Sequence, residues 1–239
     1  MPLKYVQIAV LGLVFGLQFL FEHLFPQNRK YNNWQNERFN IAIGVLNVLL
    51  VLIPAGVLVN WLEFIEQKNF GLLNQVQLPY VLYVFVVILV MDAWMYAWHR
   101  MNHTIPLLWK FHRFHHKDAH MNSTTALRFH FAELLFSYPG KALVCFLAGI
   151  DYTSLLVYET IFFASVVFHH SNIFISDKAD DRYKRLLVSP KMHRIHHSRR
   201  HEETNSNFGA LFSFWDKLFG SWKAKPKGEI IFGVETQDR

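Results

Sequence analysis

Long runs of apolar residues alternate with short polar segments along this 239-residue chain. Residues 5–21 and 39–62 contain no charged side chain, and residues 78–98 contain a single one, Asp92. Each run approaches or exceeds the roughly 20 apolar residues that a helix needs to cross a bilayer. The pattern therefore predicts three membrane helices in the first hundred residues.

A fourth apolar region, residues 134–168, is longer but is interrupted by five residues: Pro139, Gly140, Lys141, Asp151 and Glu159. Such interruptions predict a helical hairpin, which need not cross the bilayer completely. The predicted fold is an all-α integral membrane protein with four to five membrane helices, and this hairpin supplies the last two. A histidine-rich helical domain is expected to cap them.

Composition supports a membrane protein and limits its chemistry. Hydrophobic residues make up 52% of the chain and charged residues only 18%, which is too apolar for an ordinary soluble domain. The single cysteine, Cys145, excludes a disulfide framework and a thiolate metal site. The net charge is +6, but acidic residues are interleaved with the basic ones. We therefore expect anionic lipid headgroups, and not nucleic acid, to bind the basic residues.

The positions of lysine and arginine predict the orientation. Basic residues gather in 22–38, 99–130 and 177–203, whereas the loop 63–77 carries only Lys68. Short loops rich in basic residues face the cytoplasm. All the histidine-rich segments are therefore expected on the cytoplasmic side of a membrane, and a bacterial inner membrane is the predicted location.

Histidine is the most informative residue type in the chain, with 14 copies. Most fall in three short signatures, HRMNH, HRFHH and HRIHH, in which helical spacing would place the rings along one stripe. These signatures supply eight imidazoles, which is too many for one ion and suits two. The eight are His99, His103, His112, His115, His116, His193, His196 and His197.

The number and type of ligands favour iron over zinc. Zinc usually takes four ligands, so a cage of eight or more histidines is excessive for it, whereas iron tolerates higher coordination and is redox-active. Asp92 lies seven residues before His99, on roughly the same helical face. We expect its carboxylate to accept a hydrogen bond from the second ring nitrogen of a ligand histidine.

Six segments together resemble the fatty acid hydroxylase superfamily, a group of membrane di-iron enzymes that includes sterol desaturases and alkylglycerol monooxygenases. The resemblance covers residues 92–222 and includes DAWMYAWHRMNH, LLWKFHRFHH, TTALRFHFAE, FHHSN, SPKMHRIHHS and NSNFGALFSFWDKLFGSW. It divides the chain into membrane helices at 1–91, a catalytic domain at 92–222 and a tail at 223–239.

The resemblance implies two irons held by the eight histidines above and by His170. His130 is a further candidate ligand, although its counterpart is present in only part of the family, and His169 stands where relatives often have another polar residue. Two departures, Phe131 for a proline and Phe208 for a tyrosine, leave the candidate ligands intact. Asp92, Glu133, Asn172 and Asn207 are the candidate catalytic residues. His23, His120 and His201 match no motif and are expected at the surface.

The expected reaction is hydroxylation of a lipid C–H bond with dioxygen; desaturation at the same site stays open. The sequence contains no haem-binding module, nucleotide fingerprint or iron–sulfur motif. We therefore expect no bound haem or nucleotide, and a separate electron donor, a small cytochrome or ferredoxin with its reductase. Basic residues that would suit an acidic donor are Arg182, Lys184, Arg185 and Arg194.

Two other classes of protein fit the sequence less well. A membrane zinc hydrolase needs a general base beside the metal, such as HExxH, which the sequence lacks. A metal or haem transporter should carry ligands along a path inside its helices, whereas these ligands gather on one side. The pattern favours the oxygenase but determines neither the lipid nor the oligomeric state.

Overall fold

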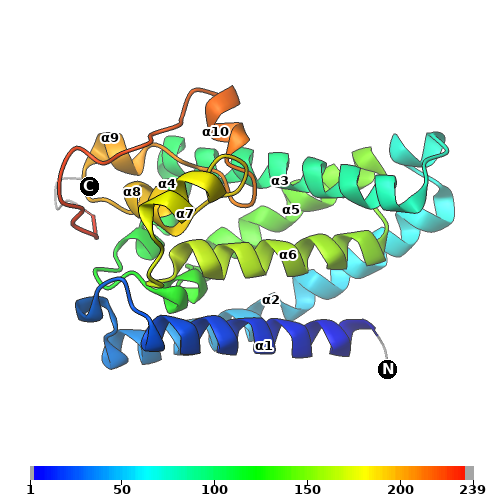
Figure 1. The fold of residues 1–239 in the computed structure, drawn as a ribbon. Coiled ribbons are helices and arrows are strands. Elements are labelled where there is room, and N and C mark those ends of the chain that lie inside the picture. Colours follow the sequence, from blue (N-terminus) through cyan, green and yellow to red (C-terminus); the bar gives the residue numbers. More distant parts are fainter. Residues whose placement is uncertain (1–2, 235–239) are drawn as a thin grey trace.

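Five long helices form the body of the protein in a computed structural model that describes residues 3–234 (Figure 1). They are α1 (Leu3–Leu24), α2 (Trp34–Lys68), α3 (Tyr80–Thr104), α5 (Phe131–Ala148) and α6 (Tyr152–His170). Each is long and apolar enough to cross a membrane. The three early spans and the later hairpin are thus confirmed, and both helices of the hairpin have spanning length.

The shorter elements gather at one end of this bundle (Figure 1). They are α4 (Pro106–His116), α7 (Asp177–Tyr183), α8 (Pro190–His196), α9 (His201–Thr204), α10 (Phe214–Leu218) and the 3₁₀ turns η1 (Arg29–Tyr31) and η3 (Ser123–Leu127). A third 3₁₀ turn, η2 (Leu73–Gln75), lies in the connection between α2 and α3. The ends of α1, α3 and α6 and the starts of α2 and α5 therefore meet the capping elements.

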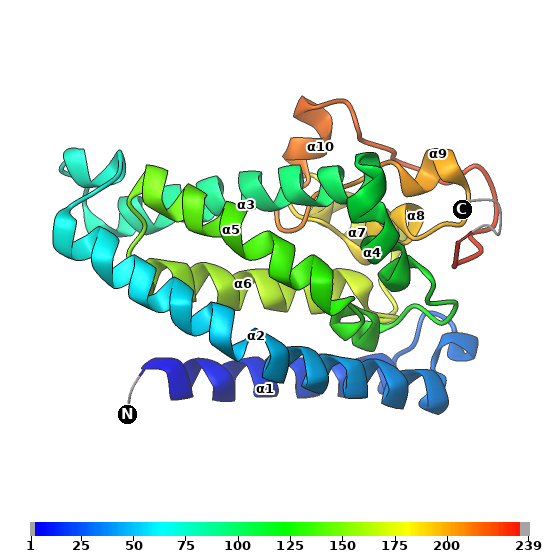
Figure 2. The same cartoon turned by 180° about the vertical axis from the view of Figure 1, so that it is seen from behind.

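Helix α2 is longer than a bilayer requires. Its 35 residues extend about 52 Å at 1.5 Å per residue, compared with a hydrocarbon core of about 30 Å. It crosses the bundle diagonally between α1 and α5 (Figure 2). Many of its large apolar side chains are exposed, including Val48, Leu49 and Ile53, as are those of α1. These surfaces are suited to contact with lipid tails.

Glycine makes the turn between α5 and α6 possible. Gly149 ends α5 with φ of 78°, a left-handed conformation that favours glycine, and the Asp151 side chain caps α6 by accepting from the amide of Ser154. A Cβ at Gly71 would lie 2.1 Å from the Gly149 nitrogen. The α2–α3 and α5–α6 connections therefore pack backbone against backbone.

Buried polar residues of α2 fix the segment that follows α4. The Asp118 carboxylate accepts hydrogen bonds from the side chains of Asn36, Asn40 and Thr125. Glu22, at the end of α1, accepts from the amide and hydroxyl of Ser123 in the same segment. Satisfied buried networks of this kind specify one arrangement, so they hold the α4 segment in a defined position at the end of the bundle.

Candidate metal centre

Four helices bring histidine side chains together at the capped end of the bundle. Helix α3 carries His99 and His103 near its last turn, α4 carries the HRFHH set, α6 ends at His170, and α8 carries the HRIHH set except His197, which directly follows it. These short helices are set by local sequence signals: proline stands first in α4 and α8, and the Ser189 hydroxyl caps α8 by accepting from the amide of Met192.

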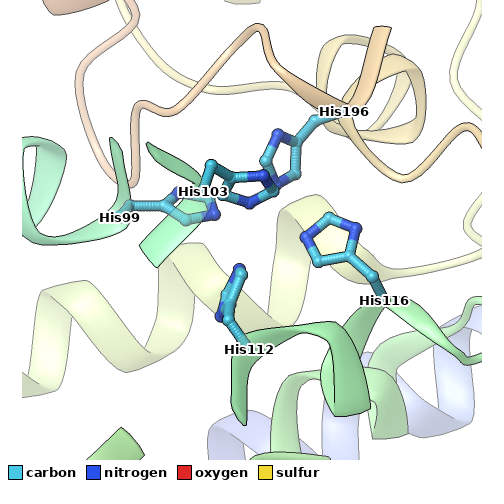
Figure 3. Close-up of side chains that lie close together, drawn as sticks. All are labelled: His99, His103, His112, His116 and His196. Carbon is cyan, nitrogen blue, oxygen red and sulfur yellow. The ribbon is translucent and has the colours of Figure 1, made fainter. Parts of the chain in front are cut away.

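The rings form two groups whose candidate ligand atoms lie within 4.8 Å of one another in each group. We call them the first and second histidine groups. The first, drawn in Figure 3, comprises His99, His103, His112, His116 and His196. The second comprises His115, His170, His193 and His197.

Each triplet is divided between the two groups. His112 and His116 enter the first group while His115 enters the second, and in α8 only His196 enters the first. The predicted set of three rings on each helix therefore supplies ligand atoms to both groups. Rings of the two groups are in contact: those of His116, in the first group, and His197, in the second, stack with centroids 4.4 Å apart.

Backbone carbonyls fix the orientation of three rings. The Nδ1 atoms of His99 and His196 each lie 2.8 Å from a carbonyl oxygen, those of Phe208 and Ser206, and His170 Nδ1 lies 2.7 Å from that of Val166. A carbonyl only accepts, so each Nδ1 must carry the proton. The lone pair of each ring is then on Nε2, which is the atom available to a metal.

Glu133 performs the same function for a fourth ring. Its Oε1 atom lies 2.8 Å from His112 Nδ1 and also accepts from the side-chain amide of Asn102 at 3.1 Å. A carboxylate in this position orients a ligand histidine and raises its basicity. Glu133, a candidate catalytic residue by its motif, therefore lies behind the histidines.

The expectation for Asp92 is wrong. Its carboxylate accepts from the amides of Leu211 and Phe212 at 3.0 Å and from the indole nitrogen of Trp215 at 2.9 Å. These three donors belong to the aromatic-rich segment 205–222 and not to a histidine. Asp92 therefore anchors that segment to α3.

In the second group, three ring nitrogens converge on a fourth. His170 Nε2 lies 3.1, 3.0 and 3.2 Å from the Nε2 atoms of His115, His193 and His197 respectively. Because His170 carries its proton on Nδ1, it has only a lone pair to present to these neighbours. Two nitrogens at right angles on a metal, each about 2.1 Å from it, are about 3.0 Å apart. The observed separations match a shared ion.

Unpartnered nitrogens provide an independent test of metal fit. Several buried ring nitrogens in these groups have no hydrogen-bond partner among the described residues, and each such atom would cost about 1–3 kcal/mol. They are both nitrogens of His103 and His116, Nε2 of His112 and His196, and Nδ1 of His193 and His197. A bound metal would satisfy several of them at once, so the residues fit a metal centre.

Burial keeps five of the histidine rings neutral. It lowers the pKa of His115, His116, His193, His196 and His197 well below 6.5, and neighbouring imidazoles lower it further. Metal ligation requires a deprotonated ring nitrogen. These rings can therefore bind a metal ion at neutral pH without first losing a proton.

His130 and His169 lie outside both groups. The Nδ1 atom of His130 accepts from the amide of Ala132 at 3.2 Å, which caps α5, and its ring packs on Phe111. His130 therefore caps α5 and belongs to neither histidine group, unlike the other candidate ligands. His169 is buried with its ring centroid 4.1 Å from that of His193. It therefore lines the second group.

The two candidate asparagines hold the chain around the centre. Asn172 donates to the Asn28 carbonyl and the Asn32 side chain, and so ties the end of α6 to the loop after α1. Asn207, with φ of 55°, donates to the carbonyls of Met192 and Lys223. The carbonyls of its neighbours Ser206 and Phe208 accept from His196 and His99, so Asn207 is a positioning residue.

Asp216 is a site residue that the sequence motifs did not reveal, and Arg194 does not lie where they predicted it. Asp216 accepts from the amides of Phe208 and Gly209 at 2.7 and 2.9 Å, which fixes the loop that carries the Phe208 carbonyl. An acid inside an aromatic-rich segment was the available signal. Arg194 is buried and donates to the Ser171 carbonyl, so it does not belong to the basic surface assigned to an electron donor.

A cavity of about 290 Å³ extends from the histidines into the bundle. Its wall at the metal end includes His99, His112, His115, His170 and His193. Beyond them it is lined mainly by apolar side chains of α3, α5 and α6, together with Lys141 and Glu159. An apolar molecule in this space would reach both histidine groups.

The fold and site define a helical membrane protein with a histidine cluster able to bind metal at one end. The sequence model for fatty acid hydroxylase matches residues 84–221, more than half of the chain, and the chain belongs to that family. Family members are lipid oxidoreductases, in keeping with the expected class of enzyme.

Three similar proteins illustrate the range of relatives. The ornithine lipid hydroxylase OlsE of Rhizobium tropici is 26% identical over 215 residues, which are 87% of this chain and 64% of that protein. Human alkylglycerol monooxygenase is 26% identical over 144 residues (60% of this chain, 31% of that protein) and mouse cholesterol 25-hydroxylase is 26% identical over 160 residues (62% and 49%). The chain thus spans less than two thirds of each of them. No solved structure matches it.

Proposed function

We propose that this protein hydroxylates a C–H bond of a membrane lipid with dioxygen at a pair of irons. The observation that carries the proposal is the convergence of nine imidazoles, in two adjoining groups, on one end of an apolar cavity. The number of ligands suits two ions, and the cavity presents a lipid to both. Residues 92–222 contribute these ligands, while residues 1–91 supply membrane helices.

The irons, when bound, supply the reduction of dioxygen that breaks a C–H bond. The overall reaction converts a C–H bond, dioxygen, two electrons and two protons into a C–OH group and water. The electrons come from a separate donor, a small cytochrome or a ferredoxin with its reductase. Arg182 and Arg185, both exposed near the metal end, suit an acidic donor of this kind.

The protein's own residues bind and orient. Glu133 and the carbonyls of Phe208, Ser206 and Val166 hold four rings with Nε2 directed inward. The apolar walls exclude water, which protects an oxidising centre from side reactions. These walls also favour an apolar substrate. The part of the substrate nearest the histidines is the part that is oxidised.

The relatives favour hydroxylation over desaturation and point to the substrate class. OlsE acts on ornithine lipid, and other relatives act on alkylglycerol or cholesterol, all by their printed names as hydroxylases or monooxygenases. A lipid with a long apolar part is common to them. The basic residues at the metal end support a centre on the cytoplasmic side, and the proposed membrane is a bacterial inner membrane.

Metal content and lipid oxidation test the proposal together. Protein purified from iron-supplied cells is expected to hold about two irons per chain, because two groups are present. The double variant His115→Ala, His196→Ala, which removes one ring from each group, should lose iron and the hydroxylated product. The matched control is His201→Ala, an exposed histidine outside both groups. A single zinc, or iron unaffected by the double variant, would contradict the proposal.

A further inference from the structure

Two charged residues meet inside the membrane bundle, away from the histidines. Lys141 of α5 and Glu159 of α6 form an ion pair with Nζ and Oε1 2.6 Å apart, and their side chains are 15% and 30% exposed. Charged side chains within membrane helices are costly and mark functional sites by default. The reaction proposed above uses neither of them.

The pair faces the cavity that begins at the histidines. Lys141, Glu159 and the adjacent Tyr138 all line it, and the Lys141 ammonium lies 5.7 Å from the centre of the Tyr138 ring. Lys141 is eight residues beyond Glu133 on α5, and Glu159 is eleven residues before His170 on α6. At 1.5 Å per residue, the pair lies about 12–16 Å from the metal end along the helix axes.

Joining α5 to α6 does not require such a pair. The short turn at Gly149 already connects the two helices, and well-packed apolar residues usually replace a buried ion pair at little or no cost in stability. The bond between the two side chains uses one of three ammonium donors and one of two carboxylate oxygens. The pair therefore has donors and an acceptor left for a third group in the cavity.

The chemistry of that third group follows from the pair. Because the pair is neutral overall, an additional charge in this apolar space would be uncompensated and costly. A hydroxyl group is small and neutral, and it accepts from an ammonium while donating to a carboxylate. It matches both partners at once.

We propose, on the basis of the function proposed above, that Lys141 and Glu159 bind a hydroxyl group of the substrate while its distal C–H bond lies at the histidines. The substrate class is then an elongated lipid alcohol. Its hydroxyl group is separated from the oxidised carbon by about ten carbon–carbon bonds, or an equivalent rigid length. The fixed distance between the ion pair and the histidines then determines which carbon is oxidised.

Binding and regiochemistry test this inference with the iron-loaded, detergent-purified protein, supplied with dioxygen and with electrons from a reduced ferredoxin and its reductase. The probes are hexadecan-1-ol and hexadecane, which differ only in the hydroxyl group. A change in tryptophan fluorescence reports binding, since Trp98 lines the cavity, and mass spectrometry locates the added oxygen. The wild type should bind the alcohol about tenfold or more tightly than the alkane, the effect of a hydrogen bond to a charged partner.

The variant Lys141→Met, Glu159→Leu should bind the two probes equally and oxidise the alcohol at scattered carbons. If that variant fails to fold, Lys141→Gln, Glu159→Gln keeps a polar pair of similar size and should weaken the preference. The matched control is Lys227→Met, Glu202→Leu, which removes an exposed ion pair on the cap.

An unchanged preference in a folded variant, or loss of thermal stability alone, would overturn the inference and leave the pair a structural link. Failure of the proposed function has a different signature: neither probe is oxidised, although the alcohol still binds more tightly than the alkane. Equal binding of both probes by the wild type would also overturn the inference.

Discussion

Glu133 Oε1 lies 2.8 Å from His112 Nδ1, and both side chains are buried. Glu133 is in α5 and His112 is in α4, so this contact joins the membrane hairpin to the metal centre. It also determines which nitrogen of His112 faces the first histidine group. Its removal is the sharpest test of how the bundle supports the site.

Glu133→Ala is expected to lower metal affinity by about 10–100-fold, the usual effect of losing a carboxylate behind a ligand histidine. Glu133→Gln keeps an acceptor oxygen and should have a smaller effect. Titration of the metal-free protein with ferrous iron under anaerobic conditions measures both. Equal affinities for wild type and Glu133→Ala would show that His112 is oriented by other contacts.

Asp92→Ala should reduce stability and not chemistry. The substitution leaves two amides and the Trp215 indole without an acceptor, at a cost of about 1–3 kcal/mol for each buried donor. Thermal unfolding of the metal-free protein in detergent should shift to lower temperature. The fraction that stays folded should still bind two metal ions; loss of metal from a normally stable Asp92→Ala variant would contradict this assignment.

Asn207→Ala removes three side-chain hydrogen bonds and places a Cβ-bearing residue without a polar side chain at φ of 55°. We expect a loss of about 1–3 kcal/mol of stability and weaker iron binding, because the Phe208 and Ser206 carbonyls would shift. Asn207→Gly tolerates the backbone conformation and should recover part of both losses. A glycine variant worse than alanine would exclude backbone strain as the cause.

His130→Ala and His170→Ala should differ sharply in metal content. His130 caps α5 and lies in neither group, whereas His170 Nε2 is the atom on which the second group converges. Elemental analysis should find unchanged metal in His130→Ala, with a stability loss of about 1 kcal/mol for the cap. Metal should fall by about one ion in His170→Ala. Equal losses in both variants would restore His130 as a ligand.

The metal-free protein should lose stability as pH falls below about 6.5. Burial lowers the pKa of His116, His196 and His197 in the folded chain, so they stay neutral there. Above pH 6.5 the same residues are neutral in both states and contribute nothing. Below it the unfolded chain takes up protons that the folded chain excludes, which favours unfolding.

Thermal unfolding of the metal-free protein between pH 8 and pH 5 measures this effect. A midpoint that falls steadily below pH 6.5 is the expected result, and His116→Gln should flatten the fall because one such group is removed. A midpoint that is constant or rises on acidification would mean that the rings are solvated in the metal-free state.

The sequence by itself determined the spans, the hairpin and the nine histidines that meet. In lipid, a single chain segment can satisfy its backbone hydrogen bonds only as a helix. Long apolar runs without charge therefore predict membrane helices from the sequence pattern alone. The predicted hairpin at 134–168 corresponds to α5 and α6, and Pro139 lies inside α5 without ending it. Repeated helical spacing of imidazoles likewise predicted a shared site.

Only the tertiary structure decided which contacts each site residue makes. Sequence spacing predicted that Asp92 accepts a hydrogen bond from a ligand histidine. In the structure Glu133 of α5 accepts that bond from His112 of α4, and Asp92 accepts from a backbone amide. The division of each triplet between two groups depends on how α3, α4, α6 and α8 converge. The pairing of Lys141 with Glu159, and the cavity that both line, exist only once α5 and α6 are packed. Local periodicity fixes the face of a helix, whereas its partners depend on contacts between residues far apart in the chain.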